Sequence, residues 1–275
     1  MKLKKLLFAL NALFLVICIS SCDKDNDSEI NKDGIWLPSI IVYNYGSSIS
    51  IPKDKLSTIT KKIEYDSENR ISKINTTSIL SGTVQDMIVT TIFVYNGDNI
   101  YTKTTRTDTD YEQINVFEPK DFEIMIDGAP TYNERYKIRL DDHFRVLKYH
   151  VNPRKPVVDF KEFTYDVNGS AISIATHPWQ DERIETSLLL NDELNGVFRN
   201  VKTPAWYLTT QLDLGVIGYQ NLNNNCIKTM VGSNVLYEYK ITYNTANYPT
   251  KIIRNSIGVD NAGVLSYEIE YIKAN

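Results

Sequence analysis

Asp141, Asp142 and His143 are three adjacent residues whose types could support acid–base chemistry. A carboxylate beside an imidazole can accept or donate a proton when a substrate is held against it. The three residues stand between two stretches that alternate apolar and polar side chains, which is where a hairpin turn is expected. Exposed carboxylates in a turn keep ordinary acidity and lack an orienting partner. We therefore expect a solvated turn and predict no catalytic residue here.

Trp179 is the second residue that could do chemistry, because His177 and Gln180 flank it in the stretch THPWQDE. An indole ring can stack on a sugar ring while polar neighbours bind its hydroxyl groups. The more common arrangement is a loop aromatic folded onto the end of a sheet. Trp179, His177 and Gln180 are therefore candidate ligand-binding residues, and both interpretations stay open.

The sequence contains no motif typical of a metal or cofactor site. Cys226 and three scattered histidines do not provide the spacing of a zinc site. The chain has no G-x-S-x-G element and no glycine-rich phosphate loop. We predict no metal, no cofactor and no catalytic residue, and Cys226 is expected to pack inside a strand.

Cys22 ends an apolar run, Leu6 to Ile19, that follows the positive start Met1 to Lys5. The run is shorter than the roughly 20 residues that span a bilayer, so residues 1–21 are predicted to be a signal peptide. Its end, ISSC, resembles the bacterial lipobox. The resemblance implies cleavage before Cys22, a thioether lipid on this residue and N-acylation. An ordinary cleaved leader with an incidental cysteine is the alternative.

An acidic stretch follows the cysteine, and residues 22–34 are expected to form a flexible tether. The stretch is similar to the acidic, lysine-containing export signal of Bacteroidetes surface lipoproteins, although Asn26 interrupts it. The matching residues are Asp23, Lys24, Asp25 and Asp27. The resemblance implies a lipid-anchored protein of the outer membrane that faces the cell exterior.

One hairpin pattern recurs after residue 35: an alternating strand, Asp or Asn, a polar turn and a second alternating strand. An Asp or Asn side chain can accept a hydrogen bond from the backbone two residues later, and Asn or Gly then tolerates the left-handed conformation that closes the turn. The copies are IEYDSENRISKI (63–74), IRLDDHFRVLKY (138–149), FTYDVNGSAISI (163–174) and ITYNTANYPTKI (241–252), with looser versions at 94–103 and 189–200.

The alternation assigns one apolar and one polar face to these strands. Tyr267, Ile269 and Tyr271 share a face against Glu268 and Glu270. A period of two with one polar face is typical of an antiparallel, half-solvated sheet. One short helix is expected in TPAWYLTTQL (203–212), with Thr203 as its N-cap and Pro204 at the first helical position.

The hairpins resemble the tyrosine–aspartate repeats of secreted bacterial proteins. Together with the lipobox they are similar to a Bacteroidetes lipoprotein family of unknown function that has a porin-like fold. The resemblance implies an all-β, antiparallel meander of consecutive hairpins, curled into a soluble barrel or half-barrel with at most one short helix, in a single domain at 35–275. The family has no assigned catalytic residues, and residues 105–135 match it little. The segments that match best are YDSENRISKI (65–74), YDVNGSAISI (165–174), LNNNCIKTM (222–230) and YNTANYPTKI (243–252).

The formal net charge of −4 speaks against nucleic-acid binding, which depends on neutralising phosphates. We expect a non-enzymatic lipoprotein that binds a glycan, an apolar ligand or an envelope protein, and that contacts the lipid membrane through acylated Cys22. A structural component of a surface assembly and an envelope polysaccharide hydrolase are the alternatives. The oligomeric state does not follow from the sequence.

Overall fold

The structure is a computed structural model, and it describes residues 34–46, 57–80, 83–127, 135–150, 160–177, 184–212, 217–258 and 265–274. Residues Trp36–Asn275 form one compact unit. Outside the described residues lie the predicted signal peptide, the lipidation site Cys22 and the export signal of Asp23, Lys24, Asp25 and Asp27. These assignments stay predictions.

Strands dominate the described part of the chain, with two short helices, α2 (Ala205–Thr210) and α3 (Ile217–Gln220). Among the described residues, no helix has the length and apolar character needed to cross a bilayer. In chain order the strands are β1 (Trp36–Tyr45), β2 (Ser57–Tyr65), β3 (Ile71–Leu80), β4 (Thr83–Asn96), β5 (Asn99–Arg106), β6 (Glu112–Phe117), β7 (Glu123–Asp127), β8 (Arg135–Leu140), β9 (Val146–His150), β10 (Phe160–Tyr165), β11 (Ala171–His177), β12 (Glu185–Asn191), β13 (Cys226–Val231), β14 (Asn234–Tyr243), β15 (Pro249–Ser256) and β16 (Leu265–Lys273).

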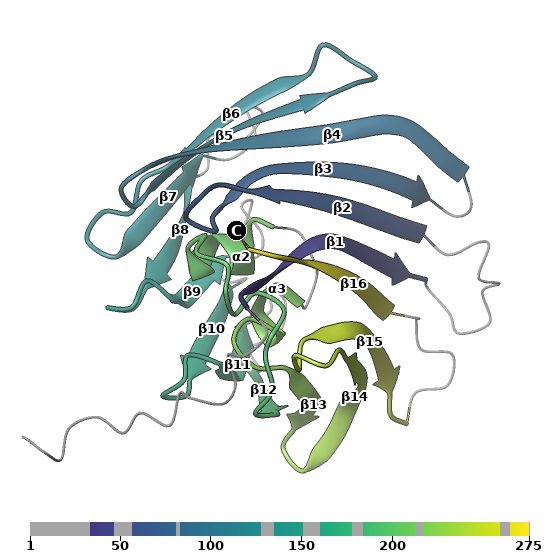
Figure 1. Cartoon of the computed structure of the whole chain (residues 1–275). Helices are drawn as coiled ribbons and strands as arrows, with labels where there is room; N and C mark the ends of the chain where they lie inside the picture. Colours follow the sequence, from purple (N-terminus) through teal and green to yellow (C-terminus); the bar gives the residue numbers. More distant parts are fainter. Residues whose placement is uncertain are drawn as a thin grey trace, which may run out of the picture. The chain divides into compact units, whose positions relative to one another are not determined.

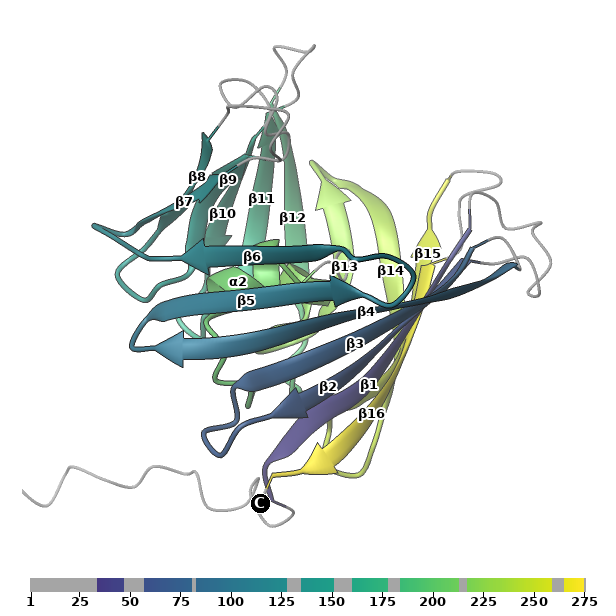
Figure 2. The ribbon, with the colours of Figure 1, turned by 90° about the horizontal axis from the view of Figure 1, so that it is seen from above.

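All of these strands belong to one antiparallel sheet that curls into a nearly closed barrel (Figures 1 and 2). Apart from β6 and β7, strands that follow one another in the chain pair with each other, and β1 pairs with β16, which joins the first and last strands. The barrel remains open between β6 and β7, where Lys120 and Glu123 form an isolated bridge. The predicted all-β meander of hairpins and its curling into a barrel are confirmed.

The turn chemistry predicted for the four main hairpins is also confirmed. In each turn one side-chain oxygen accepts the backbone N–H groups of the residues two and four positions later, at 2.8–3.0 Å. Three turns are closed by the expected left-handed residue, and the fourth by Phe144 at φ 57°. The oxygens belong to Asp66, Asp141, Asp166 and Asn244, and the other left-handed residues are Asn69, Gly169 and Asn247.

The apolar face of the sheet points into the barrel. Tyr267 and Ile269 are buried in the core while Glu268 and Glu270 are exposed, as the alternation predicts. The outer face instead carries ion pairs between neighbouring strands. They are Lys73–Glu64, Lys103–Glu112, Lys148–Glu162, Lys228–Glu238 and Lys251–Glu268, with N–O distances of 2.8–3.6 Å.

The helical region differs from its prediction in two ways. The structure has two short helices where at most one was expected, because residues 217–220 also form a helical turn. The predicted N-cap is wrong: Pro204 occupies the cap position of α2, without a side-chain hydrogen bond. Thr203 instead accepts the backbone N–H of Ile71 at 2.8 Å, across the barrel interior.

The looser hairpin predicted at 189–200 does not form. β12 ends at Asn191, and the chain then runs through the barrel interior until β13 begins at Cys226. We call residues 192–212 and 217–225 the plug. Figure 2 shows α2 of the plug inside the curve of the sheet.

Candidate functional site

The plug fills the inside of the barrel with large side chains. Trp206 is fully buried, and its ring lies 5.7 Å from that of Phe117 on β6. Tyr207 contacts the same phenylalanine edge-on at 5.5 Å and Phe93 of β4 at 5.3 Å. On the other side of the barrel, Tyr219 meets Phe163 of β10 at 5.8 Å. The plug therefore packs against strands on both sides, and the barrel acts as a filled scaffold at this level.

A polar network joins the two ends of the plug. Asp192 accepts the backbone N–H of Asn225 at 3.1 Å and the hydroxyl of Tyr243. The fully buried Asn225 side chain donates to the Asn195 carbonyl at 2.9 Å. Burial and the bond to the Asp192 carboxylate both raise the pKa of Tyr243, so its hydroxyl stays a donor. These bonds satisfy groups that would otherwise be buried without partners.

Backbone contacts hold the two stretches side by side. Gly196 donates to the Asn223 carbonyl at 2.7 Å, and Val197 donates to that of Asn221 at 2.8 Å. A Cβ atom at Gly196 would lie 2.4 Å from the Leu222 carbonyl oxygen, so only glycine fits this approach. The network thereby places the side chains of both stretches beside the turn between β10 and β11.

A polar cavity of about 530 Å³ lies at this meeting point. We call it the amide cavity. One lining residue comes from the β10–β11 turn, two from the stretch after β12 and two from the stretch before β13. They are Asn168, Glu193, Arg199, Asn223 and Asn224.

Only part of the hydrogen-bonding capacity of the lining is used within the protein. Asn223 donates to the Asn168 carbonyl at 3.0 Å, and Asn224 donates to the Leu194 carbonyl at 3.0 Å. Among the residues that the structure describes, the exposed side chains of Glu193 and Arg199 have neither an ion-pair partner nor a hydrogen-bond partner. The cavity thus presents a carboxylate, a guanidinium and amide groups to the solvent, a set that can both donate and accept.

Comparison with known proteins supports the fold. The chain shares its fold with a porin-like protein from Bacteroides uniformis. The match to that crystal structure has a TM-score of 0.53 and 11% sequence identity, and it covers 86% of this chain and 98% of the other. No protein-family model matches the chain, and no curated protein sequence matches it significantly.

Of the candidate residues predicted around Trp179, the structure describes only His177, which is not among the lining residues of the amide cavity. Trp179 and Gln180 are outside the described residues, whereas His177 is the last residue of β11. The cavity instead adjoins the turn that precedes β11. His177 stacks on Phe160 at 3.9 Å, and its Nε2 lies 3.2 Å from Glu162. The structure therefore places this histidine in a local cluster at the opposite end of β11.

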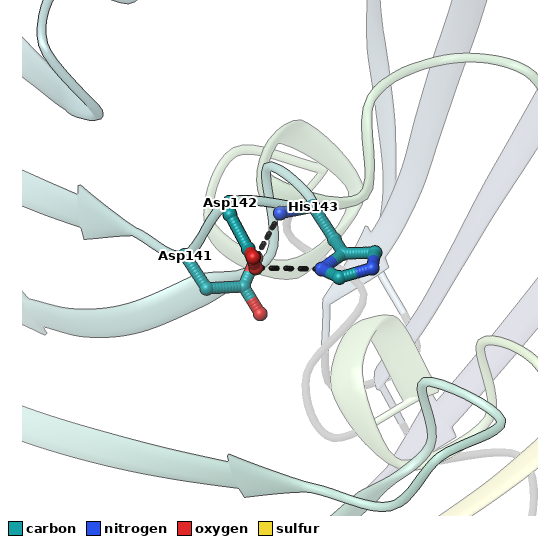
Figure 3. Close-up of side chains that lie close together, drawn as sticks. All are labelled: Asp141, Asp142 and His143. Carbon is teal, nitrogen blue, oxygen red and sulfur yellow. Dashed lines mark hydrogen bonds and ion pairs between the residues drawn. The ribbon is translucent and has the colours of Figure 1, made fainter.

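The Asp141–Asp142–His143 group lies on the turn between β8 and β9 (Figure 3). Its ligand atoms are within 4.8 Å of one another. The Asp141 carboxylate is already occupied, because it accepts two backbone N–H groups and the Nε of Arg145 at 2.6 Å. Partial burial acts to raise the pKa of Asp141, but these donors hold it below its ordinary value. The geometry is that of a closed hairpin turn with Asp142 and His143 exposed.

Cys226 lies where the sequence predicts, fully buried at the start of β13. Burial raises the pKa of its thiol to about 12, which makes the thiol unreactive at neutral pH. Sequence analysis missed the amide cavity. The run NLNNN at 221–225 was the available signal, because its four asparagine side chains need hydrogen-bond partners wherever they are buried.

Proposed function

We propose that the chain is a lipid-anchored, non-enzymatic binding module of the bacterial outer membrane that holds a polyhydroxylated ligand, such as a glycan, in the amide cavity. The filled barrel supplies a rigid support. The cavity supplies convergent polar groups, which is the usual composition of a specific small-molecule site. The ligand's hydroxyl groups match side chains that both donate and accept.

The observation that carries this proposal is the pair Glu193 and Arg199. The two side chains line one cavity and neither is paired within the described part of the chain. Both groups are free to bond a ligand that reaches the cavity, and hydrogen bonds to charged groups are stronger than those between neutral groups. Among the lining residues that the structure describes, Glu193 is the only one with a carboxylate. A glycoside hydrolase needs two, which favours binding over hydrolysis.

The outer face of the barrel supports a tethered body in water. Its cross-strand ion pairs would be costly in hydrocarbon, where charged side chains on the lipid face destabilise a barrel. Attachment to the membrane is therefore assigned to acylated Cys22. Several acyl chains hold a protein firmly, because each buried methylene contributes roughly 0.8 kcal/mol.

A glycan array probed with the purified full chain tests this function. We expect a defined set of glycans to bind the wild type, and Glu193→Gln and Arg199→Gln each to weaken that binding about tenfold. Neither substitution removes a side-chain hydrogen bond to another described residue, so both variants should fold. Asn255→Ala, on the exposed outer face of β15, is the matched control and should bind as the wild type does. An array on which the wild type and the cavity variants give the same signals would refute the assignment.

A further inference from the structure

Within the described part of the chain, buried polar atoms without a hydrogen-bond partner lie on the inner face of β14 and β15, the inner wall, and at the end of α3. They are the Nε of Arg254, the hydroxyl of Tyr239 and the Oε1 of Gln220. Tyr239 and Gln220 are 8% and 6% exposed. A buried donor or acceptor without a hydrogen bond is costly, so several such atoms close together call for a partner such as a water, an ion or a ligand.

The three side chains come from neighbouring positions. Arg254 and Tyr239 are directly opposite each other in the β14–β15 pairing. Gln220, at the end of α3, reaches Thr229 of β13 with a long 3.5 Å contact. Burial raises the pKa of Tyr239 to about 12, and the nearby Thr229 and Gln220 offset part of this rise. Neither gives the Tyr239 hydroxyl a hydrogen bond of good geometry. The unpartnered atoms thus converge on one part of the wall.

Arg254 brings a positive charge to the barrel interior. It lies on the same face as Ile252, which is 1% exposed and part of the core. Its guanidinium stacks over the ring of Tyr237 at 4.5 Å. Among the described residues no carboxylate lies within ion-pair distance of it. A buried or half-buried arginine normally has an anionic partner.

Solvent reaches this part of the wall. Arg254 and Tyr237 face inward yet are both half-buried rather than buried. Arg254 is two residues before the end of β15, at the end of the barrel opposite the hairpin turns and the amide cavity.

We propose that this inner wall is a second binding site, specific for an oxyanion: the carboxylate or phosphate group of a small ligand. The Arg254 guanidinium and the Tyr239 hydroxyl donate to the oxyanion. The Gln220 Oε1 accepts a hydrogen bond from a hydroxyl group of the ligand next to the oxyanion. We call these three residues the anion wall. The site is separate from the amide cavity and does not rest on the function proposed there.

Isothermal titration of the full chain in a neutral detergent tests the anion wall. The probes are D-glucuronate, inorganic phosphate and D-glucose. We expect saturable binding of at least one anion and none of glucose, which has the same ring as glucuronate without the charge. The preferred anion then distinguishes a carboxylate from a phosphate ligand. Loss of a charge-assisted hydrogen bond should weaken binding about tenfold or more in Arg254→Gln.

Tyr239→Phe removes one hydroxyl, keeps the ring, and should weaken anion binding several-fold. The controls are Tyr101→Phe on β5 and Arg199→Gln in the amide cavity, and both should bind the anion as the wild type does. If Arg254→Gln fails to fold, which its near-UV spectrum will show, Tyr239→Phe decides the question. The proposal is overturned if neither anion binds the wild type, if glucose binds equally well and loses affinity in Arg254→Gln, or if the folded variants keep wild-type affinity for the anion. Loss of anion binding in Arg199→Gln would show that the anion binds in the amide cavity, and would also overturn the proposal.

Discussion

A single side-chain oxygen closes each main hairpin of this barrel. Asp141, like Asp66, binds two backbone N–H groups and the side chain of an arginine four residues later. The sequence predicts this role from residue type and spacing alone, because an Asx turn needs only local contacts. What it does not predict is Phe144 in the left-handed position, where its ring packs against Phe122 at 5.7 Å.

Asp141→Ala should destabilise the fold by about 1–3 kcal/mol, because three donors lose their common acceptor. Asp141→Asn keeps the acceptor for the backbone and should cost less. Urea unfolding at pH 7 measures both. Asp142→Ala is the control, because Asp142 is exposed and bonds only to His143. Equal stability of the wild type and Asp141→Ala would show that the turn closes without this carboxylate.

The same carboxylate should make stability depend on pH. The pKa of Asp141 is lowered in the folded state. Its ionic contribution is therefore fully present above the ordinary carboxyl pKa of about 4 and is lost as the pH falls through the lower folded value. We expect the stability gap between wild type and Asp141→Asn to shrink between about pH 5 and pH 2. A gap that widens on acidification would have the wrong sign.

Cys226 should be protected from thiol reagents. With Cys18→Ser and Cys22→Ser, it is the one remaining thiol in the chain. Because burial raises its pKa to about 12, we expect almost no reaction with a disulfide reagent at pH 8 and rapid reaction in denaturant. Rapid labelling of the native protein would show that β13 begins outside the core.

At the scale of the element, the difference between local and non-local contacts explains which elements could be predicted from the sequence. The hairpins could be predicted from the sequence because each consists of two consecutive strands. The plug could not be predicted, because its contacts join residues far apart in the chain. Thr203 accepts a hydrogen bond from the backbone of the distant Ile71 and does not cap its own helix. Asp192 accepts a hydrogen bond from Asn225 and does not close a hairpin. Residues 105–135, which matched little, include the open seam between β6 and β7.

Gly196 is the position where the plug tolerates least change. Gly196→Ala would push a Cβ against the Leu222 backbone, and we expect a loss of about 1–3 kcal/mol or more in unfolding free energy. Gly232→Asn is the control, because nothing lies within 4 Å of that site and asparagine tolerates its positive φ. Thermal unfolding of both variants measures the difference. Equal melting temperatures would mean that the two stretches of the plug lie further apart.

At the scale of the whole molecule, pairing of the first and last strands closes the sheet, and the plug fills it. The strands and their curling followed from the alternation and from the resemblance to a porin-like family. The filled interior did not, because no pattern in the sequence marks residues 192–212 and 217–225 as internal. The fold is porin-like, yet its interior at the level of the plug holds aromatic and apolar side chains.

Attachment to the membrane is predicted to depend on Cys22. Cys22→Ala should leave the chain unlipidated and poorly processed, because the thioether has no sulfur to form on. Intact mass spectrometry of the membrane fraction measures this change. The wild type should show the mass of a chain that begins at residue 22 and carries acyl groups. Protease treatment of intact cells should remove it if it faces outward. An acylated Cys22→Ala chain would exclude this anchor.

The most direct test of the binding module is the affinity of the full chain for its best glycan, compared with that of Arg199→Gln. The side chain of Arg199 has no partner in the described protein, so its loss should weaken binding about tenfold without changing the melting temperature. Undiminished affinity in Arg199→Gln would place the ligand elsewhere and contradict the role given to the amide cavity.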